Sequence, residues 1–374
     1  MGWVVECGSG VDWFGSVQFC KMVSKRGRQR HGGLPRVAAG VFIVCALLTI
    51  YGVINMRADV PVDELQQPRE KRFKERFKLN VAYAITITKD GNYIDGAAVL
   101  KESVSMIPTK HNVDYVAIVH PEVQTTRPTL LKLGFKIREF QAPITSAEIE
   151  GKHLRETIDK SGCCGALELL KLQAYTLTEY DKIVLMDMDT IMLKDIDHLL
   201  EEDIEAQFTY DYAMDGRNTP APPVQGGFFV LKPSKKTFLK LIDIVREGDF
   251  QPGTGWGGTG IGWCWGGQTV QGLVSYYYNL VSKGNGKALN HCTYNAMVST
   301  KDCEATPLES VYGAHFTVCQ KPWDCRVSNL KLCRELIKSW WDIRRHLEKR
   351  LNLPVSTTDG CRSRSREYTS IKIV

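Results

Sequence analysis

The chain has 374 residues, of which 43% are hydrophobic and 24% charged, values that are ordinary for a globular protein. This length allows one large α/β domain with extensions. Residues 1–36 hold six Lys/Arg against Glu6 and Asp12, which gives +4 of the total net charge of +6. The remaining residues therefore carry only +2, and this near-neutral balance argues against a nucleic-acid-binding protein.

Residues 37–56, VAAGVFIVCALLTIYGVINM, contain no charged side chain. A stretch of this length can cross a bilayer as one helix. The basic residues precede it, which favours a cytosolic tail over residues 1–36 and a luminal body after the span. A cleaved signal peptide is the alternative, although its apolar region is usually shorter and ends at small residues. A buried core helix is a third interpretation.

Polar residues with mixed charge follow the predicted anchor and suggest a stem over residues 57–79. We expect the folded body over residues 80–351. After it, residues 352–374 are rich in Ser, Thr and Arg and are expected to form a flexible tail.

Strand-like and helix-like segments alternate along the first half of the body. This order is typical of βαβ units and predicts an α/β fold with a mostly parallel sheet flanked by helices. Strands are predicted over residues 81–89, 115–120 and 135–140, and helices over residues 93–104, 128–133 and 167–180.

The apolar run Ile183-Val184-Leu185-Met186 leads directly into Asp187-Met188-Asp189. A short run of branched apolar residues is typical of a strand buried on both faces. Side chains two apart on a strand project to one face, so Asp187 and Asp189 can share a divalent cation. Ligands of open α/β sheets bind at this carboxyl end of the strands.

Four later segments also contain residue types suited to a ligand site. Glycines 226 and 227 precede an apolar strand and permit close approach of a ligand to the backbone, or form a bulge. Residues 253–268 interleave three tryptophans with glycines, either as sugar-stacking surfaces or as a packed structural loop. His315 can complete a cation shell, and Lys321 beside Pro322 can neutralise a phosphate.

Five of the twelve cysteines lie between residues 292 and 333. In an oxidising compartment this density predicts one or two disulfides. Nine cysteines follow the predicted span, an odd number, so at least one thiol remains free or pairs between chains.

Several segments together resemble glycosyltransferase family 8, the glycogenin-like enzymes. The matching segments are AITITKDGNYIDGAAVLKESV (84–104), LLKLQAYTLTEYDKIVLMDMDT (169–190), GGFFVLKPS (226–234), GGQTVQG (266–272) and HFTVCQKPW (315–323). The resemblance implies a GT-A, Rossmann-like domain, here preceded by one transmembrane helix, that transfers a hexose or pentose from a nucleotide-diphospho-sugar.

The resemblance also implies roles for individual residues. The metal ligands, for Mn²⁺ or another divalent cation, would be Asp187, Asp189 and His315. Residues matching the donor-binding positions are Thr86, Thr88, Tyr93, Lys171, Gly226, Gly227 and Lys321, with Tyr93 stacking on the uracil. Lys171 and Gln268 match catalytic positions, and the relatives retain the anomeric configuration.

Two departures from the family concern the sugar side of the site. Gly267 stands where glycogenin-like enzymes have an acidic residue, and Gln225-Gly226-Gly227 replaces their Asn-Ser-Gly. The first departure weakens a double-displacement mechanism, and both are expected to affect sugar specificity.

We therefore expect a Mn²⁺-dependent, retaining glycosyltransferase of the Golgi or another secretory-pathway membrane. Its donor would be a UDP-sugar, and its acceptor a glycan, lipid or protein. One alternative is a non-catalytic membrane protein with a degenerate transferase fold. Another is a haloacid-dehalogenase-like phosphohydrolase, although that motif normally sits on the first strand of its domain, whereas about a hundred residues of βα pattern precede Asp187 here.

Overall fold

The computed structural model divides the chain into two units, Met1–Glu75 and Arg76–Val374. In the first unit β1 (Trp3–Gly8) and β2 (Phe19–Ser24) pair antiparallel, within the segment predicted as a basic tail. The described residues are 3–8, 19–24 and 78–373, except 92, 215–220, 357–360 and 362–367.

The predicted membrane span over residues 37–56 and nearly all of the stem lie outside the described residues. Among the residues that are described, no helix combines the length and the apolar character needed to cross a bilayer. The anchor therefore stays a prediction.

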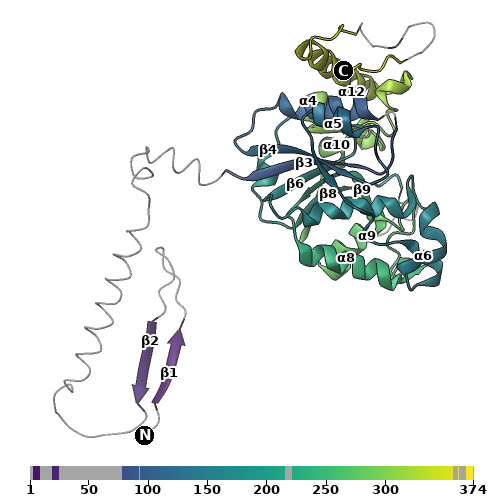
Figure 1. The fold of residues 1–374 in the computed structure, drawn as a ribbon. Helices are drawn as coiled ribbons and strands as arrows, with labels where there is room; N and C mark the ends of the chain where they lie inside the picture. Colours follow the sequence, from purple (N-terminus) through teal and green to yellow (C-terminus); the bar gives the residue numbers. More distant parts are fainter. Residues whose placement is uncertain are drawn as a thin grey trace, which may run out of the picture. The chain divides into compact units, whose positions relative to one another are not determined.

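The second unit is organised around a seven-stranded sheet with the order β12-β8-β9-β6-β3-β4-β5 (Figure 1). All neighbouring pairs are parallel except those of β9, which runs antiparallel to both β6 and β8. This confirms the predicted mostly parallel sheet. Its strands are β3 (Asn80–Ile87), β4 (Asn112–Val119), β5 (Lys136–Glu139), β6 (Lys182–Met186), β8 (Ala206–Tyr210), β9 (Val224–Leu231) and β12 (Gly286–Leu289).

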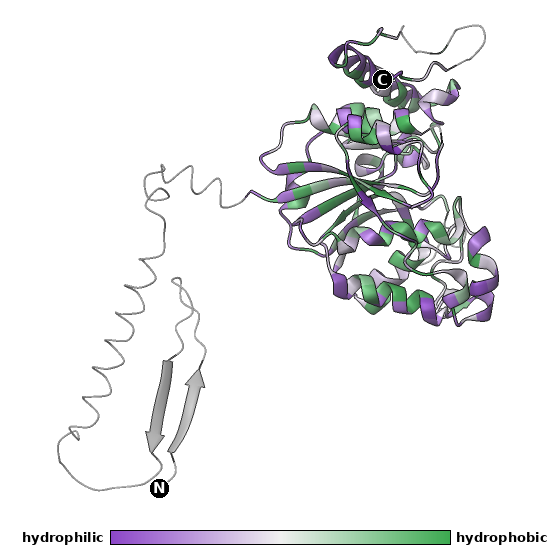
Figure 2. Ribbon diagram, viewed as in Figure 1, coloured by the Kyte–Doolittle hydropathy of each residue, from purple (hydrophilic) through white to green (hydrophobic). Residues whose placement is uncertain are grey.

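Both faces of the sheet are buried, because alternate side chains of each central strand enter different cores. On β6, Val184 and Met186 pack on one side and Ile183 and Leu185 on the other. Apolar residues accordingly concentrate in the strands (Figure 2). The continuous apolar run before Asp187 is therefore explained by burial on two faces.

Two groups of helices cover these faces and lie on opposite sides of the sheet in Figure 1. One face is covered by α4 (Ile94–Ser105), α5 (Arg127–Lys132), α7 (Asp197–Leu200) and α12 (Lys331–Arg350). The other is covered by α6 (Lys152–Thr157), α8 (Lys235–Glu247), α9 (Val270–Tyr276), the 3₁₀ helix η3 (Gly165–Thr176) and the π-helix η4 (Tyr277–Val281).

The segment predicted as a helix over residues 167–180 is the 3₁₀ helix η3, which ends at Thr176. Its apolar residues recur every three to four positions, a spacing that suits either helix type. Shorter elements complete the unit: α10 (His291–Tyr294), α11 (Lys301–Glu304), η1 (Ser146–Glu148), η2 (Ile158–Lys160), η5 (Leu308–Ser310), η6 (Pro322–Asp324), β10 (Phe250–Gln251) and β11 (Gly255–Trp256).

A small second sheet brings distant segments together at the carboxyl end of β6. The strand β7 (Thr190–Met192) follows the Asp pair and pairs antiparallel with β13 (Gly313–His315). In this register His315 lies opposite Thr190. The backbone N–H of Phe316 also donates to the carbonyl of Asp189 at 2.9 Å.

Three disulfides are present among the described residues: Cys292–Cys303, Cys319–Cys333 and Cys325–Cys361. The sequence predicted one or two, from the five cysteines between 292 and 333, and did not include Cys361.

The described part of the predicted flexible tail is held to the body. Cys361 is joined to Cys325, and the backbone N–H of Ile371 donates to Asp95 of α4 at 2.8 Å. The Tyr368 hydroxyl also donates to Asp95, at 2.5 Å. These contacts join the described residues around Cys361 and Ile371 to the body, and the flexibility of the tail stays a prediction.

Candidate active site

A cleft of about 400 Å³ lies at the carboxyl ends of β3 and β6, as predicted for an open α/β sheet. Its polar and charged lining residues come from six separate segments of the chain. They include Thr86, Thr88, Lys89, Glu168, Lys171, Asp187, Asp189, Gln225, Gln271, His315, Thr317 and Lys321.

Each carboxylate of the Asp pair is paired with a lysine. The Lys171 Nζ lies 2.8 Å from the Asp187 Oδ1 and donates to the Gly226 carbonyl at 3.0 Å. Lys321, which follows the Asp pair in the sequence whereas Lys171 precedes it, forms an ion pair with the Asp189 Oδ2. Glu168 also lies 3.8 Å from Lys171, so this ammonium faces two carboxylates.

His315 lies against the same carboxylates. Its Nε2 is 3.3 Å from the Asp189 Oδ1 and 3.0 Å from the Thr317 hydroxyl, and the residue is 3% exposed. Gly227 makes this position available, because a Cβ there would lie 2.4 Å from the His315 Cε1. The pairing of β7 with β13 and the absent side chain at Gly227 together position the imidazole.

Burial and charge act in opposite directions on these groups. Burial raises the pKa of Asp187 above its usual value, although the Lys171 ammonium opposes the shift. Burial would also raise the pKa of Asp189, but His315 and Lys321 outweigh it and hold that pKa below its usual range. Burial would lower the pKa of Lys171, yet Asp187 and Glu168 raise it, so this ammonium stays charged.

The donor set of this cluster suits a divalent cation. One ligand atom from each of Asp187, Asp189 and His315 lies within 4.8 Å of the other two. Two carboxylates and an imidazole are compatible with Mn²⁺.

The structure brings most of the predicted site residues to this cleft. Thr86, Thr88, Tyr93, Lys171, Gly226 and Lys321 line it together with the three predicted metal ligands. Gly227 lies directly behind His315. Gln268 differs: its Nε2 donates to the Thr157 hydroxyl at 2.8 Å, and Gln271 lines the cleft instead.

The packing of the glycine-rich loop explains Gly267, which stands where relatives have an acid. A Cβ on Gly267 would lie 1.6 Å from the carbonyl oxygen of Gly262, so no larger residue fits this backbone. The Trp256 indole fixes the loop further by donating to the Gly267 carbonyl at 2.9 Å.

The loop tryptophans separate into different roles. Trp256 is 1% exposed and packs edge-on against Phe250, as a structural loop requires. Trp265 is 58% exposed and lines the cleft, where a sugar ring can stack on it. The structural interpretation is confirmed for Trp256, and sugar stacking stays a prediction for Trp265.

Sequence reasoning missed several residues of the cleft. Glu168 and Gln271 lie within or beside the segments that resemble the family, but no role was assigned to them. Cys163 and Cys164 also line the cleft, and no local pattern indicated this position.

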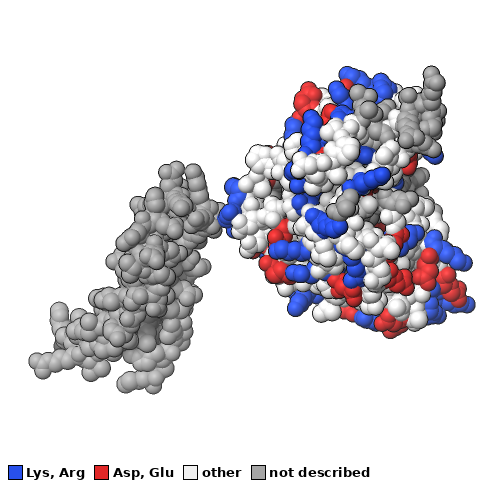
Figure 3. Space-filling model, turned by 45° about the horizontal axis from the view of Figure 1, so that its top comes forward, with Lys and Arg blue, Asp and Glu red and all other residues white. Residues whose placement is uncertain are grey.

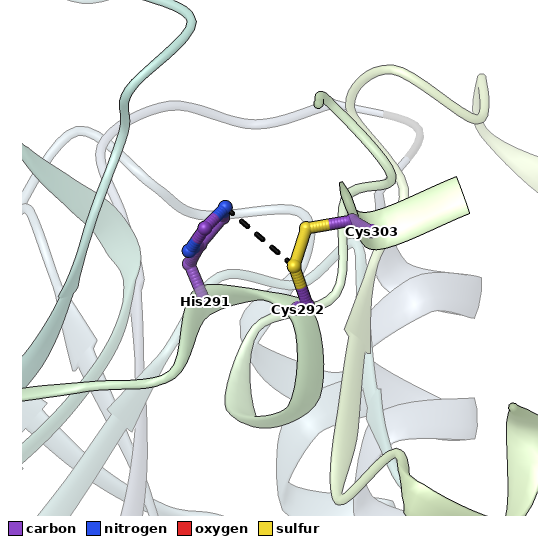
Figure 4. A group of neighbouring side chains, drawn as sticks. All are labelled: His291, Cys292 and Cys303. Carbon is purple, nitrogen blue, oxygen red and sulfur yellow. Dashed lines mark hydrogen bonds between the residues drawn. A yellow bond between two sulfur atoms is a disulfide. The ribbon is translucent and has the colours of Figure 1, made fainter. Parts of the chain in front are cut away.

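A second group of possible metal ligands, His291, Cys292 and Cys303, is not a thiolate site (Figure 4). The two cysteines form a disulfide, and the His291 Nε2 lies 3.6 Å from the Cys292 Sγ. Thiolates are the form in which cysteine binds metals, and the disulfide removes both.

Basic and acidic side chains both occur across the face shown in Figure 3. This distribution agrees with the near-neutral charge of the body.

A comparison with protein families indicates the activity of this chain. Residues 84–221 match the model of glycosyl transferase family 8. This match supports a glycosyltransferase. It covers less than half of the chain and includes β3, η3, β6 and the Asp pair. No curated protein matches the sequence.

Solved glycosyltransferases are similar to this chain at low identity. The bifunctional glycosyltransferase WbbM is 17% identical, with a TM-score of 0.46, over 73% of this chain and 52% of its own. GlyE of Streptococcus pneumoniae TIGR4 is 15% identical (TM-score 0.44; 78% and 66%). The galactosyltransferase LgtC, solved with donor and acceptor sugar analogues, is 13% identical (TM-score 0.42; 70% and 96%). The chain thus spans about half of the WbbM chain and about two thirds of the GlyE chain.

Proposed function

We propose that this glycosyltransferase moves a sugar from a UDP-sugar to an acceptor hydroxyl, with Mn²⁺ or another divalent cation and with retention of configuration. The observation that carries the proposal is the cluster of Asp187, Asp189 and His315, flanked by Lys171 and Lys321 in one cleft.

The reaction explains why both kinds of charge are present. A bound cation, held by Asp187, Asp189 and His315, would supply Lewis-acid stabilisation to the diphosphate. Lys321 and Lys171 add positive charge near the same oxygens. Because the diphosphate gains charge as the bond to the sugar breaks, these groups stabilise the transition state more than the ground state.

The cleft residues near Tyr93 support the assignment of a UDP-sugar as the donor. Tyr93 is 43% exposed beside Thr86 and Thr88 at the end of β3, where its ring is available to a flat base. Gln225 and Gly226 also line the cleft, and the Lys171 Nζ donates to the Gly226 carbonyl; we assign both residues to the sugar side of the donor. Because Gly267 excludes an acidic side chain, we favour front-face attack by the acceptor over a covalent intermediate at that position.

A secretory-pathway location, with a single-pass anchor over residues 37–56, is part of the proposal. The three disulfides support it, because disulfides persist mainly in oxidising compartments. Carbonate extraction of membranes tests the anchor: the proposal expects the protein in the pellet, and release into the supernatant overturns it.

The activity is tested on the purified full-length chain with a panel of UDP-sugars, with and without Mn²⁺. We expect Mn²⁺-dependent hydrolysis or transfer for at least one donor and loss of it in an Asp187→Asn, Asp189→Asn double variant. Normal turnover in that variant would overturn the metal assignment. Failure to bind any UDP-sugar would instead favour a non-catalytic protein with this fold, for which the position of Gln268 is the supporting observation.

A further inference from the structure

We propose that Cys163 and Cys164 form a reversible dithiol/disulfide site in the wall of the cleft, oxidised by low-molecular-weight disulfides. The two residues are adjacent in sequence, and their sulfur atoms lie 2.7 Å apart. Cys163 is exposed, so a small disulfide reagent can reach the pair. Both residues line the cleft together with Thr88 and Lys171.

The backbone around the pair can accommodate ring closure. Gly162 and Gly165 flank the two cysteines, and both have positive φ, at 64° and 59°. Glycine adopts this region without steric cost, so the turn can change its conformation more readily than one bounded by larger residues. The turn also leads directly into η3, which carries Glu168 and Lys171.

Adjacent cysteines give a disulfide that differs from the other three in this protein. Consecutive Cα atoms are ~3.8 Å apart, below the ~4.4 Å at which usual disulfides begin. The Cα atoms of the three disulfides described above are 4.8, 5.1 and 5.7 Å apart. Strained or exposed disulfides are reduced more easily, so the pair is suited to switching, whereas the other three are structural.

The chemistry balances with a small disulfide as the oxidant. The Cys164 thiolate attacks RSSR, which forms a mixed disulfide and releases RS⁻. The Cys163 thiol then gives its proton to solvent and attacks the Cys164 sulfur, which closes the ring and releases the second RS⁻. The Cys163 thiol lowers the pKa of Cys164 to about 7, which favours Cys164 as the first nucleophile.

Ring closure changes a contact that reaches the proposed metal site. While Cys164 is protonated, the Cys163 S–H donates to the Glu168 Oε1 at 3.0 Å, and Glu168 lies 3.8 Å from the Lys171 Nζ. Once Cys164 is a thiolate, the same S–H donates to the Cys164 sulfur instead. The disulfide has no S–H to donate, so Glu168 loses this partner. Its carboxylate then competes with Asp187 for the Lys171 ammonium.

The site is tested on the full-length chain incubated with oxidised glutathione and analysed by peptide mass spectrometry. We expect the peptide that holds both cysteines to lose two hydrogen atoms and to regain them with reduced glutathione. Cys163→Ser and Cys164→Ser should each abolish this loss, and Cys264→Ser, in the neighbouring loop, should preserve it. A peptide that stays fully reduced in the wild-type chain, or that carries only glutathione, overturns the proposal.

A second arm tests the position of the pair in the cleft and, unlike the first, rests on the proposed function. UDP with Mn²⁺ at about ten times its dissociation constant should slow the oxidation roughly tenfold, because bound chains are protected. Oxidation at an unchanged rate while UDP binds would overturn the link between the pair and the donor. Absence of UDP binding would overturn the proposed function and leave the first arm intact.

Discussion

Gly227 and His315 lie so close that a Cβ on the glycine would be 2.4 Å from the Cε1 of the imidazole and 2.6 Å from its Nδ1. Gly227→Ala should therefore displace His315 from the Asp pair. We expect Mn²⁺ affinity to fall roughly 10–100-fold, the range found when groups that orient metal ligands are changed. Calorimetric titration with Mn²⁺ measures this.

The neighbouring glycine supplies a matched control. A Cβ on Gly226 would meet first the Lys171 Nζ, at 3.3 Å, which is the mobile end of a side chain. Gly226→Ala should therefore weaken Mn²⁺ binding much less than Gly227→Ala. Equal affinities in the two variants would contradict the role of Gly227.

The ion pair between Lys171 and Asp187 predicts a measurable coupling in metal-free protein. The Lys171 side chain is 8% exposed, so Asp187→Asn leaves a nearly buried ammonium with Glu168 as its remaining carboxylate partner. We expect the free energy of unfolding to fall by about 1–3 kcal/mol, below the ~3–5 kcal/mol of fully buried pairs.

A double-mutant cycle with Lys171→Met tests this coupling by urea unfolding in the presence of a chelator. The double variant should lose less stability than the sum of the single variants, by about 0.5–3 kcal/mol. Strict additivity would show that the two side chains do not interact.

Two of the three tryptophans of the glycine-rich loop, Trp256 and Trp265, predict different effects on stability. Trp256 is buried and its indole donates a hydrogen bond, so Trp256→Ala should lower the free energy of unfolding by about 3–5 kcal/mol. Trp265→Ala should change it by less than about 0.5 kcal/mol, because the side chain is exposed. It should instead raise the KM for the acceptor without changing donor hydrolysis. A destabilised Trp265→Ala chain would argue against this division.

Glu102 of α4 predicts a pH-dependent contribution to stability. Its carboxylate accepts hydrogen bonds from the Arg350 Nη2 and Nε of α12 at 2.7 and 2.9 Å, and lies 2.7 Å from the His346 Nδ1. Burial would raise the pKa of Glu102, but Arg350 and His346 outweigh it and lower that pKa.

A carboxyl group whose pKa is lower in the folded state stabilises the fold above its unfolded pKa of ~4.3, and this contribution is lost as the pH falls through its folded value. Glu102→Gln should therefore lower the free energy of unfolding by about 1–2 kcal/mol at pH 7. The difference from the wild type should shrink toward pH 3 in urea titrations. A difference that does not depend on pH would refute the assignment.

Local sequence pattern was sufficient for much of the fold. Apolar runs bounded by turn residues predicted β3, β4, β5 and β6 in a parallel arrangement, since burial on two faces requires such runs. The same pattern placed Asp187 and Asp189 at the carboxyl end of a central strand. It did not predict the antiparallel direction of β9, because direction depends on the path of the chain between strands.

The sequence by itself determined the Asp pair, the βαβ order and, through resemblance, several of the residues that line the cleft. Only the tertiary structure decided which of them meet. Pairing of β7 with β13 brings His315 to Asp189, loop packing buries Trp256 and turns Gln268 to Thr157, and the turn before η3 places Cys163 beside Glu168. These contacts join residues far apart in the chain or depend on how a loop packs. The sequence could not predict them, because the periodicity of apolar residues indicates only which face of its own helix or strand a residue occupies.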